Sequence, residues 1–165
     1  MAYLREMLPG VEVWGTEMAP TVAKLSNWTI NWDFHVVKPE WRHAADFVFS
    51  NALDHSPNAR LAVTRWMEEV APRGALIIEW CRMDGYTSGT DVFGGSWQHY
   101  ADVIREAGRA AKERFDVVGT FDNVDTLPKN IPKGHRTEWD RWKRQFRVWI
   151  VVQRNTNHDA STARR

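Results

Sequence analysis

The sequence predicts an α/β fold, a three-layer sandwich around a mostly parallel sheet, on three observations. Strand-like and helix-like segments alternate along most of the chain, as they do where helices connect parallel strands. The apolar run Ala75–Ile78 suits a strand that is covered on both faces. Two final strand-like segments, Phe115–Phe121 and Arg147–Val152, have no helix between them, so we expect them to form an antiparallel hairpin at one edge.

Length and composition indicate one domain of an ordinary globular protein. The chain has 165 residues, and we expect a domain over residues 1–154 followed by a polar, disordered tail over residues 155–165. The net charge of +1 argues against nucleic acid as the partner, and a single cysteine, Cys81, excludes an internal disulfide. The apolar runs are too short to cross a bilayer and no signal peptide opens the chain, so we expect no membrane partner and a cytoplasmic location.

The N-terminal quarter contains two expected strands and a short helix. Val11–Gly15 alternates apolar and polar residues, as a half-buried strand does. Thr21–Leu25 follows Pro20 and supplies a short helix. Trp28–Asp33 is rich in residues that favour strands, and His35–Ala44 is expected to be a surface loop.

The middle of the chain predicts two strands, each followed by a helix. Asp46–Asn51 looks like a buried strand, and a helix over Pro57–Ala71 would begin with Asn58 as its N-cap. Ala75–Trp80 is the next strand, after a break at Pro72–Gly74. The following helix has one apolar face, made by Trp97, Tyr100, Ile104, Ala107 and Ala111.

Ligands of such sheets bind at the carboxyl ends of strands, which directs attention first to Glu17 and Asp33. Glu17 could accept hydrogen bonds from the two hydroxyls of a ribose, or it could interact with the dipole of the next helix. Asp33 could accept a hydrogen bond from an adenine amino group while Phe34 covers the ring. A turn residue beside a core aromatic is the other interpretation of this pair.

Ser50–Ser56 is the densest polar run at a strand end. Its small residues allow a ligand close to the backbone, and Asp54 and His55 could act as acid, base or substrate contacts. The alternative is a loop whose polar side chains only satisfy backbone donors. The remaining histidines show no metal-ligand spacing, so no metal site is expected. Basic and aromatic residues alternate over Lys129–Arg147, which suits a solvated face or a flap over a substrate better than RNA contact.

Three segments together resemble class I S-adenosylmethionine-dependent methyltransferases. Trp14–Pro20 is similar to the second-strand motif of that family, with Gly15 and the acid Glu17. Asp46–His55 resembles its fourth-strand motif, an Asp-Phe-Val strand that leads to a polar segment and a histidine. Trp66–Glu79 resembles the helix, turn and fifth strand that follow. The resemblance covers about residues 1–121 and implies a Rossmann-like sheet, which the C-terminal hairpin completes.

For the cofactor S-adenosylmethionine, the resemblance implies a role for each matching residue. Glu17 would hold the ribose hydroxyls, Met18 would pack on the adenine, Asp33 would accept from its amino group, and Phe34 would lie beside the ring.

The fourth-strand motif would serve the rest of the cofactor and the acceptor. Ser50 and Asn51 would line the methionine portion, largely through backbone groups, and Asp54 and His55 would face a small-molecule acceptor. In the methyl transfer that this implies, His55 is the candidate base, and Asp54 is its orienting partner or an alternative contact.

The first strand of that family and its glycine-rich loop should precede Met1, so we expect a truncated or degenerate member whose sheet has unpaired edges. A non-catalytic binding or dimerisation module, with a partner chain or second copy on those edges, is therefore the alternative function. A nicotinamide-dependent oxidoreductase also has an acid after its second strand, but the segment Asn51–His55 and the edge hairpin do not favour it.

Overall fold

The computed structural model describes residues 5–6, 9–81, 87–111, 115–123 and 146–154. Most of the connection Asp122–Gln145 and the tail over residues 155–165 lie outside the described residues. The elements are β1 (Gly15–Glu17), α2 (Val22–Leu25), β2 (Thr29–Asn31), the 3-10 helix η1 (Pro39–Trp41), β3 (Ala45–Ser50), α3 (Ala59–Glu69), β4 (Val70–Cys81), α4 (Trp97–Ala110), β5 (Phe115–Asp122) and β6 (Arg147–Arg154).

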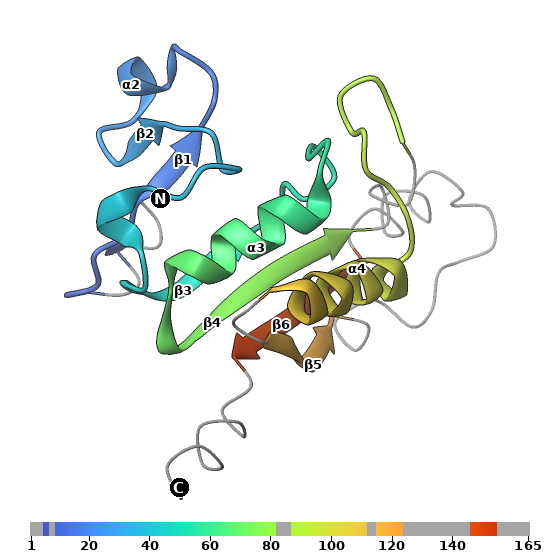
Figure 1. Ribbon diagram of the computed structural model, residues 1–165. Coiled ribbons are helices and arrows are strands. Elements are labelled where there is room, and N and C mark those ends of the chain that lie inside the picture. The colour runs from blue at the N-terminus through green and yellow to red at the C-terminus, as the bar shows by residue number, and fades with distance from the viewer. Residues whose placement is uncertain (1–4, 7–8, 82–86, 112–114, 124–145, 155–165) are drawn as a thin grey trace, which may run out of the picture.

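The strands form two sheets, which confirms the α/β prediction (Figure 1). One sheet is the parallel pair β1–β2, and the other has the order β3-β4-β6-β5. β3 and β4 are parallel, whereas β6 runs antiparallel to both β4 and β5. The antiparallel hairpin expected at the C-terminal end is therefore present, with β5 at the edge of the sheet. In the part of the chain that the structure describes, no helix is long and apolar enough to cross a membrane.

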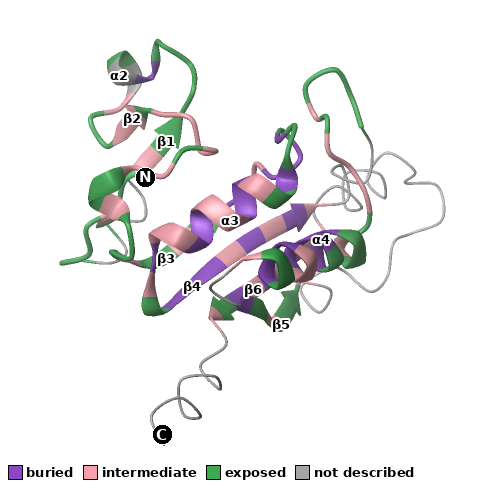
Figure 2. Cartoon of the chain, in the orientation of Figure 1, coloured by how far each residue is buried: buried purple, intermediate pink, exposed green. Residues whose placement is uncertain are grey.

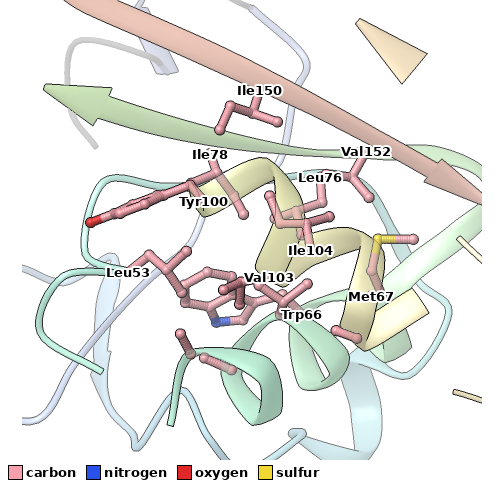
Figure 3. Close-up of a cluster of buried hydrophobic side chains, with 14 of the residues drawn as sticks. Leu53, Trp66, Met67, Leu76, Ile78, Tyr100, Val103, Ile104, Ile150 and Val152 are labelled. Carbon is pink, nitrogen blue, oxygen red and sulfur yellow. The ribbon is translucent and has the colours of Figure 1, made fainter. Parts of the chain in front are cut away.

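Helices α3 and α4 contact each other and cover one face of the larger sheet. Each helix begins at a side-chain cap, as its sequence favours: Asn58 accepts a hydrogen bond from the Leu61 backbone N–H, and Ser96 accepts one from that of His99. Side chains from both helices, from the strands beneath them and from the turn after β3 form the core (Figure 3), among them Leu53, Trp66, Met67, Leu76, Ile78, Tyr100, Val103, Ile104, Ile150 and Val152. The predicted apolar face of α4 is thus correct, with Tyr100, Ile104 and Ala107 buried.

The opposite face of this sheet is apolar and partly exposed, and the predicted burial of Asp46–Asn51 is wrong. Phe47 and Phe49 of β3 are 71% and 52% exposed, whereas most of the neighbouring strand β4 is buried or partly buried (Figure 2). Phe49 lies in register with Ile77 of β4, which pairs in turn with Val151 of β6. The reason is that β3 is an edge strand and none of the described elements packs on this face.

Two predicted boundaries also need correction. The first strand is Gly15–Glu17 rather than Val11–Gly15, because only these residues have partners in β2. β4 begins at Val70, earlier than the predicted strand Ala75–Trp80, because Val70 already pairs with Ala45 of β3. Glu17 is consequently the last residue of a strand and does not follow one.

Candidate functional site

A turn fixed by hydrogen bonds follows β1 and presents Glu17 and Met18. The Asn31 side-chain amide of β2 donates to the carbonyl oxygens of Glu17, at 3.1 Å, and Met18, at 2.7 Å. The Glu17 carboxylate accepts the Ala19 backbone N–H through Oε1 at 3.0 Å. Both Glu17 and Met18 are exposed, so the carboxylate and the thioether remain accessible to a ligand.

Beside this turn lies an open hollow of about 280 Å³, lined by Met18, Asn31, Trp32, Asp33 and Val36. The Trp32 indole donates to the Val36 carbonyl oxygen at 2.6 Å, which connects two residues that line the hollow. The hollow combines apolar side chains with the Asp33 carboxylate, a lining typical of small-ligand sites. It brings together Met18 and Asp33, which come from two different strand ends.

Asp33 is held by the imidazole and the backbone of His35. Its Oδ1 atom accepts the His35 backbone N–H at 2.8 Å and lies 2.9 Å from His35 Nδ1. The pKa of Asp33 lies below its ordinary value, chiefly because of the backbone hydrogen bond, and the imidazole lowers it further. The other ring nitrogen of His35 lies 2.8 Å from Ser56 Oγ. The sequence placed His35 in a surface loop, and the spacing Asp-x-His was the only local sign of this contact.

Phe34 points to the core rather than to the hollow. Its ring packs against Trp66 of α3, at a centroid distance of 5.5 Å, and against His35, at 4.5 Å. The residues that line the hollow do not include it. This placement agrees with the alternative interpretation, an aromatic residue that attaches the loop after β2 to the core.

Ser50 and Asn51 lie at the carboxyl end of β3. Ser50 is buried and its hydroxyl accepts the Ala52 backbone N–H at 3.2 Å, so it shapes the turn. Asn51 is exposed at the end of the strand.

His55 lies between two carboxylates, one of which the sequence did not indicate. Its Nδ1 atom is 3.3 Å from Asp91 Oδ1, and its Nε2 atom is 3.9 Å from Asp54 Oδ1. The His55 side chain is about half exposed, while Asp54 is nearly buried. The three residues offer a nitrogen and two carboxylates within 4.8 Å of one another, so they could also hold a cation. Asp91 comes from the polar stretch Asp84–Gly95, and only the tertiary structure brings it to His55.

The solved structures most similar to this chain share its fold at low sequence identity. A chain from the complex of the Haloferax volcanii Trm112 methyltransferase activator matches with a TM-score of 0.65 and 16% identity, over 92% of this chain and 75% of that one. The Burkholderia thailandensis 1,6-didemethyltoxoflavin-N1-methyltransferase, solved with S-adenosylhomocysteine, matches with a TM-score of 0.57 and 18% identity, over 94% and 65%. The fold is that of S-adenosylmethionine-dependent methyltransferases.

The same fold also serves other reactions. The [4+2]-cyclase SpnF matches with a TM-score of 0.61 and 11% identity, over 92% of this chain and 70% of that one. No family model matches this chain, and no curated protein does. Function must therefore be inferred from the residues of the site, because proteins with this fold have different activities.

Proposed function

We propose that this chain binds S-adenosylmethionine and transfers its methyl group to a small-molecule acceptor in the cytoplasm. The observation that carries the proposal is the hollow at the ends of β1 and β2. Met18 and Asp33, which the resemblance assigns to adenine, both line it, and Glu17 stands beside it at the end of β1. The matching Burkholderia thailandensis methyltransferase was solved with S-adenosylhomocysteine and a small-molecule substrate, which supports the same chemistry here.

The described residues fit the nucleoside half of this cofactor. In the proposal, Met18 packs on the base, and Asp33 accepts a hydrogen bond from its amino group. Glu17 has one carboxylate oxygen engaged with the Ala19 N–H, and the second oxygen can accept from a ribose hydroxyl. Ser50 and Asn51, at the carboxyl end of β3, would line the methionine half. When bound, the cofactor supplies an electrophilic methyl group on sulfur.

His55 is the proposed base for the acceptor. It is exposed to an incoming molecule, and Asp54 and Asp91 stand on either side of its ring. A protonated acceptor would give its proton to the imidazole, and the carboxylates would stabilise the resulting imidazolium. Positioning of the acceptor against the methyl group supplies most of the remaining acceleration, because such a displacement depends on alignment.

Calorimetry with S-adenosylhomocysteine tests the proposal. We expect the chain to bind it, and we expect Asp33→Ala to weaken binding about tenfold, which corresponds to about 1.4 kcal/mol. His55→Ala should leave this affinity nearly unchanged and lower methyl transfer. A folded chain that releases no heat with S-adenosylhomocysteine would contradict the proposal. It would support the alternative of a non-catalytic module that binds a partner chain or a second copy through the unpaired edge of β3.

A further inference from the structure

A chain of hydrogen bonds connects the hollow with the loop that carries Asp54 and His55. Asp33 Oδ1 lies 2.9 Å from His35 Nδ1, and His35 Nε2 lies 2.8 Å from Ser56 Oγ. The Ser56 hydroxyl oxygen also accepts the Asn58 backbone N–H at 3.1 Å, which leaves its own proton directed to His35. A carboxylate only accepts hydrogen bonds, so Nδ1 of His35 is the donor to Asp33, and the other ring nitrogen contacts the Ser56 hydroxyl.

This chain of hydrogen bonds spans two parts of the molecule that belong to different sheets. The β1–β2 pair and its loops stand apart from the four-stranded sheet in Figure 1. His35 belongs to the first part, whereas Ser56 immediately follows His55 and precedes α3. Phe34, the neighbour of His35, also packs on Trp66. This contact is apolar, so it cannot orient the Asp33 carboxylate.

Exposure increases along this chain of hydrogen bonds, from Ser56 through His35 to Asp33. Ser56 is 1% exposed and the His35 side chain 14%, whereas the Asp33 side chain is 44% exposed at the hollow. Ser56 is too deeply buried to attack a substrate, so the Asp-His-Ser order does not indicate a nucleophile here. The buried end of the chain lies at Ser56, and the exposed end, Asp33, lines the hollow.

We propose that His35 is a positioning residue. It orients the Asp33 carboxylate at the hollow and couples it, through Ser56, to the loop that carries Asp54 and His55. This inference rests on the proposed function, because it assigns the oriented carboxylate to the adenine amino group. The imidazole acts through Asp33 and does not itself contact the ligand.

Two substitutions of His35 separate its contacts. The amide of His35→Asn can replace Nδ1 beside Asp33, and the amide of His35→Gln can replace Nε2 beside Ser56. We expect S-adenosylhomocysteine affinity in His35→Asn to stay within about threefold of the parent, and in His35→Gln to fall about tenfold, as for loss of a hydrogen bond to a charged group. Equal losses in the two variants would overturn the proposal, because a purely structural histidine would not distinguish them.

A second pair of variants, Ser56→Ala and Asn58→Ala, tests whether Ser56 affects ligand binding through His35. Ser56→Ala removes the partner of His35 Nε2, and we expect it to weaken binding about threefold although Ser56 does not line the hollow. Asn58→Ala is the matched control, since it removes the cap of the same helix without touching His35. An equal effect of both variants would reduce the Ser56 effect to helix stability and would overturn the coupling.

Amide hydrogen exchange tests the link without a cofactor. The His35 amide donates to the Asp33 carboxylate, so it should exchange faster in His35→Gln and Ser56→Ala than in His35→Asn and Asn58→Ala. If the parent chain binds no S-adenosylhomocysteine, the proposed function fails, and this pattern of exchange still supports the positioning role. Identical exchange in all four variants would refute the positioning role whatever the cofactor does.

Discussion

At the level of single residues, Gly108 shows how closely α4 approaches β5. A Cβ atom at this position would overlap the carbonyl oxygen of Phe115 and come within 3.1 Å of its carbonyl carbon. Because these are backbone atoms, neither can rotate away. We expect Gly108→Ala to lower the free energy of unfolding by about 1–3 kcal/mol, measured by urea denaturation. Gly89→Ala, with no atom within 4 Å of the added carbon, is the control and should be nearly neutral. Equal stability of the two variants would contradict the described packing.

Glu69 makes stability depend on pH. Burial raises its pKa above the ordinary 4.5, although the Lys38 backbone N–H donates to it, and the nearby Glu68 charge adds to the rise. A carboxyl whose pKa is higher in the folded state favours folding fully below pH 4.5, and this contribution is lost as the pH rises through the raised value. Glu69→Gln should therefore be more stable than the parent at neutral pH and no more stable in acid.

Urea denaturation of the parent and of Glu69→Gln, each at neutral and at acid pH, measures this difference in the free energy of unfolding. Glu40→Gln is the matched comparison, since Glu40 is exposed and its pKa is lowered, chiefly by its hydrogen bond with Lys38. That substitution should not stabilise the protein at neutral pH. A stability gain for Glu69→Gln that is the same at both pH values would contradict the assignment.

At the level of elements, both long helices depend on a side chain that caps the first turn. Ser96 accepts the His99 N–H before α4, and without it that backbone donor loses its partner. We expect Ser96→Ala to cost about 1 kcal/mol, measured by urea denaturation. Thr64→Ala is the contrast, because Thr64 lies inside α3 and alanine favours a helix interior more than threonine does. A destabilisation by Thr64→Ala equal to that by Ser96→Ala would contradict the capping argument.

Local signals of this kind explain why the elements could be predicted. Asn58, a preferred cap residue, stands before a run of apolar residues at helical spacing, and the helix begins there. Contacts between elements leave no such local signal in the sequence. The burial of β3 was predicted from its apolar content, but burial depends on what packs on the strand, and Phe47 and Phe49 are exposed. The contact of His55 with Asp91 and that of His35 with Ser56 join residues far apart in the sequence.

At the level of the whole molecule, the exposed phenylalanines of β3 and its outer edge, which no strand among the described residues pairs with, favour association. An apolar edge strand without lysine or proline pairs readily with another strand, and β3 carries a single charge, at Asp46. We expect the protein to associate with increasing concentration in sedimentation velocity, and Phe47→Lys to weaken this. Val11→Lys, at an exposed apolar position outside the four-stranded sheet, is the control and should leave association unchanged. A parent chain that stays monomeric at all concentrations would contradict self-association and favour a different partner.

The order of the elements and the polar residues at strand ends follow from the sequence, because helix caps, apolar periodicity and strand-forming residues act over a few neighbouring positions. The arrangement of the strands in two sheets, the hollow that joins Met18 to Asp33, and the link from Asp33 through His35 to Ser56 come from tertiary structure alone. Side chains meet across a fold only after the elements have packed, and that packing depends on contacts that no local pattern encodes.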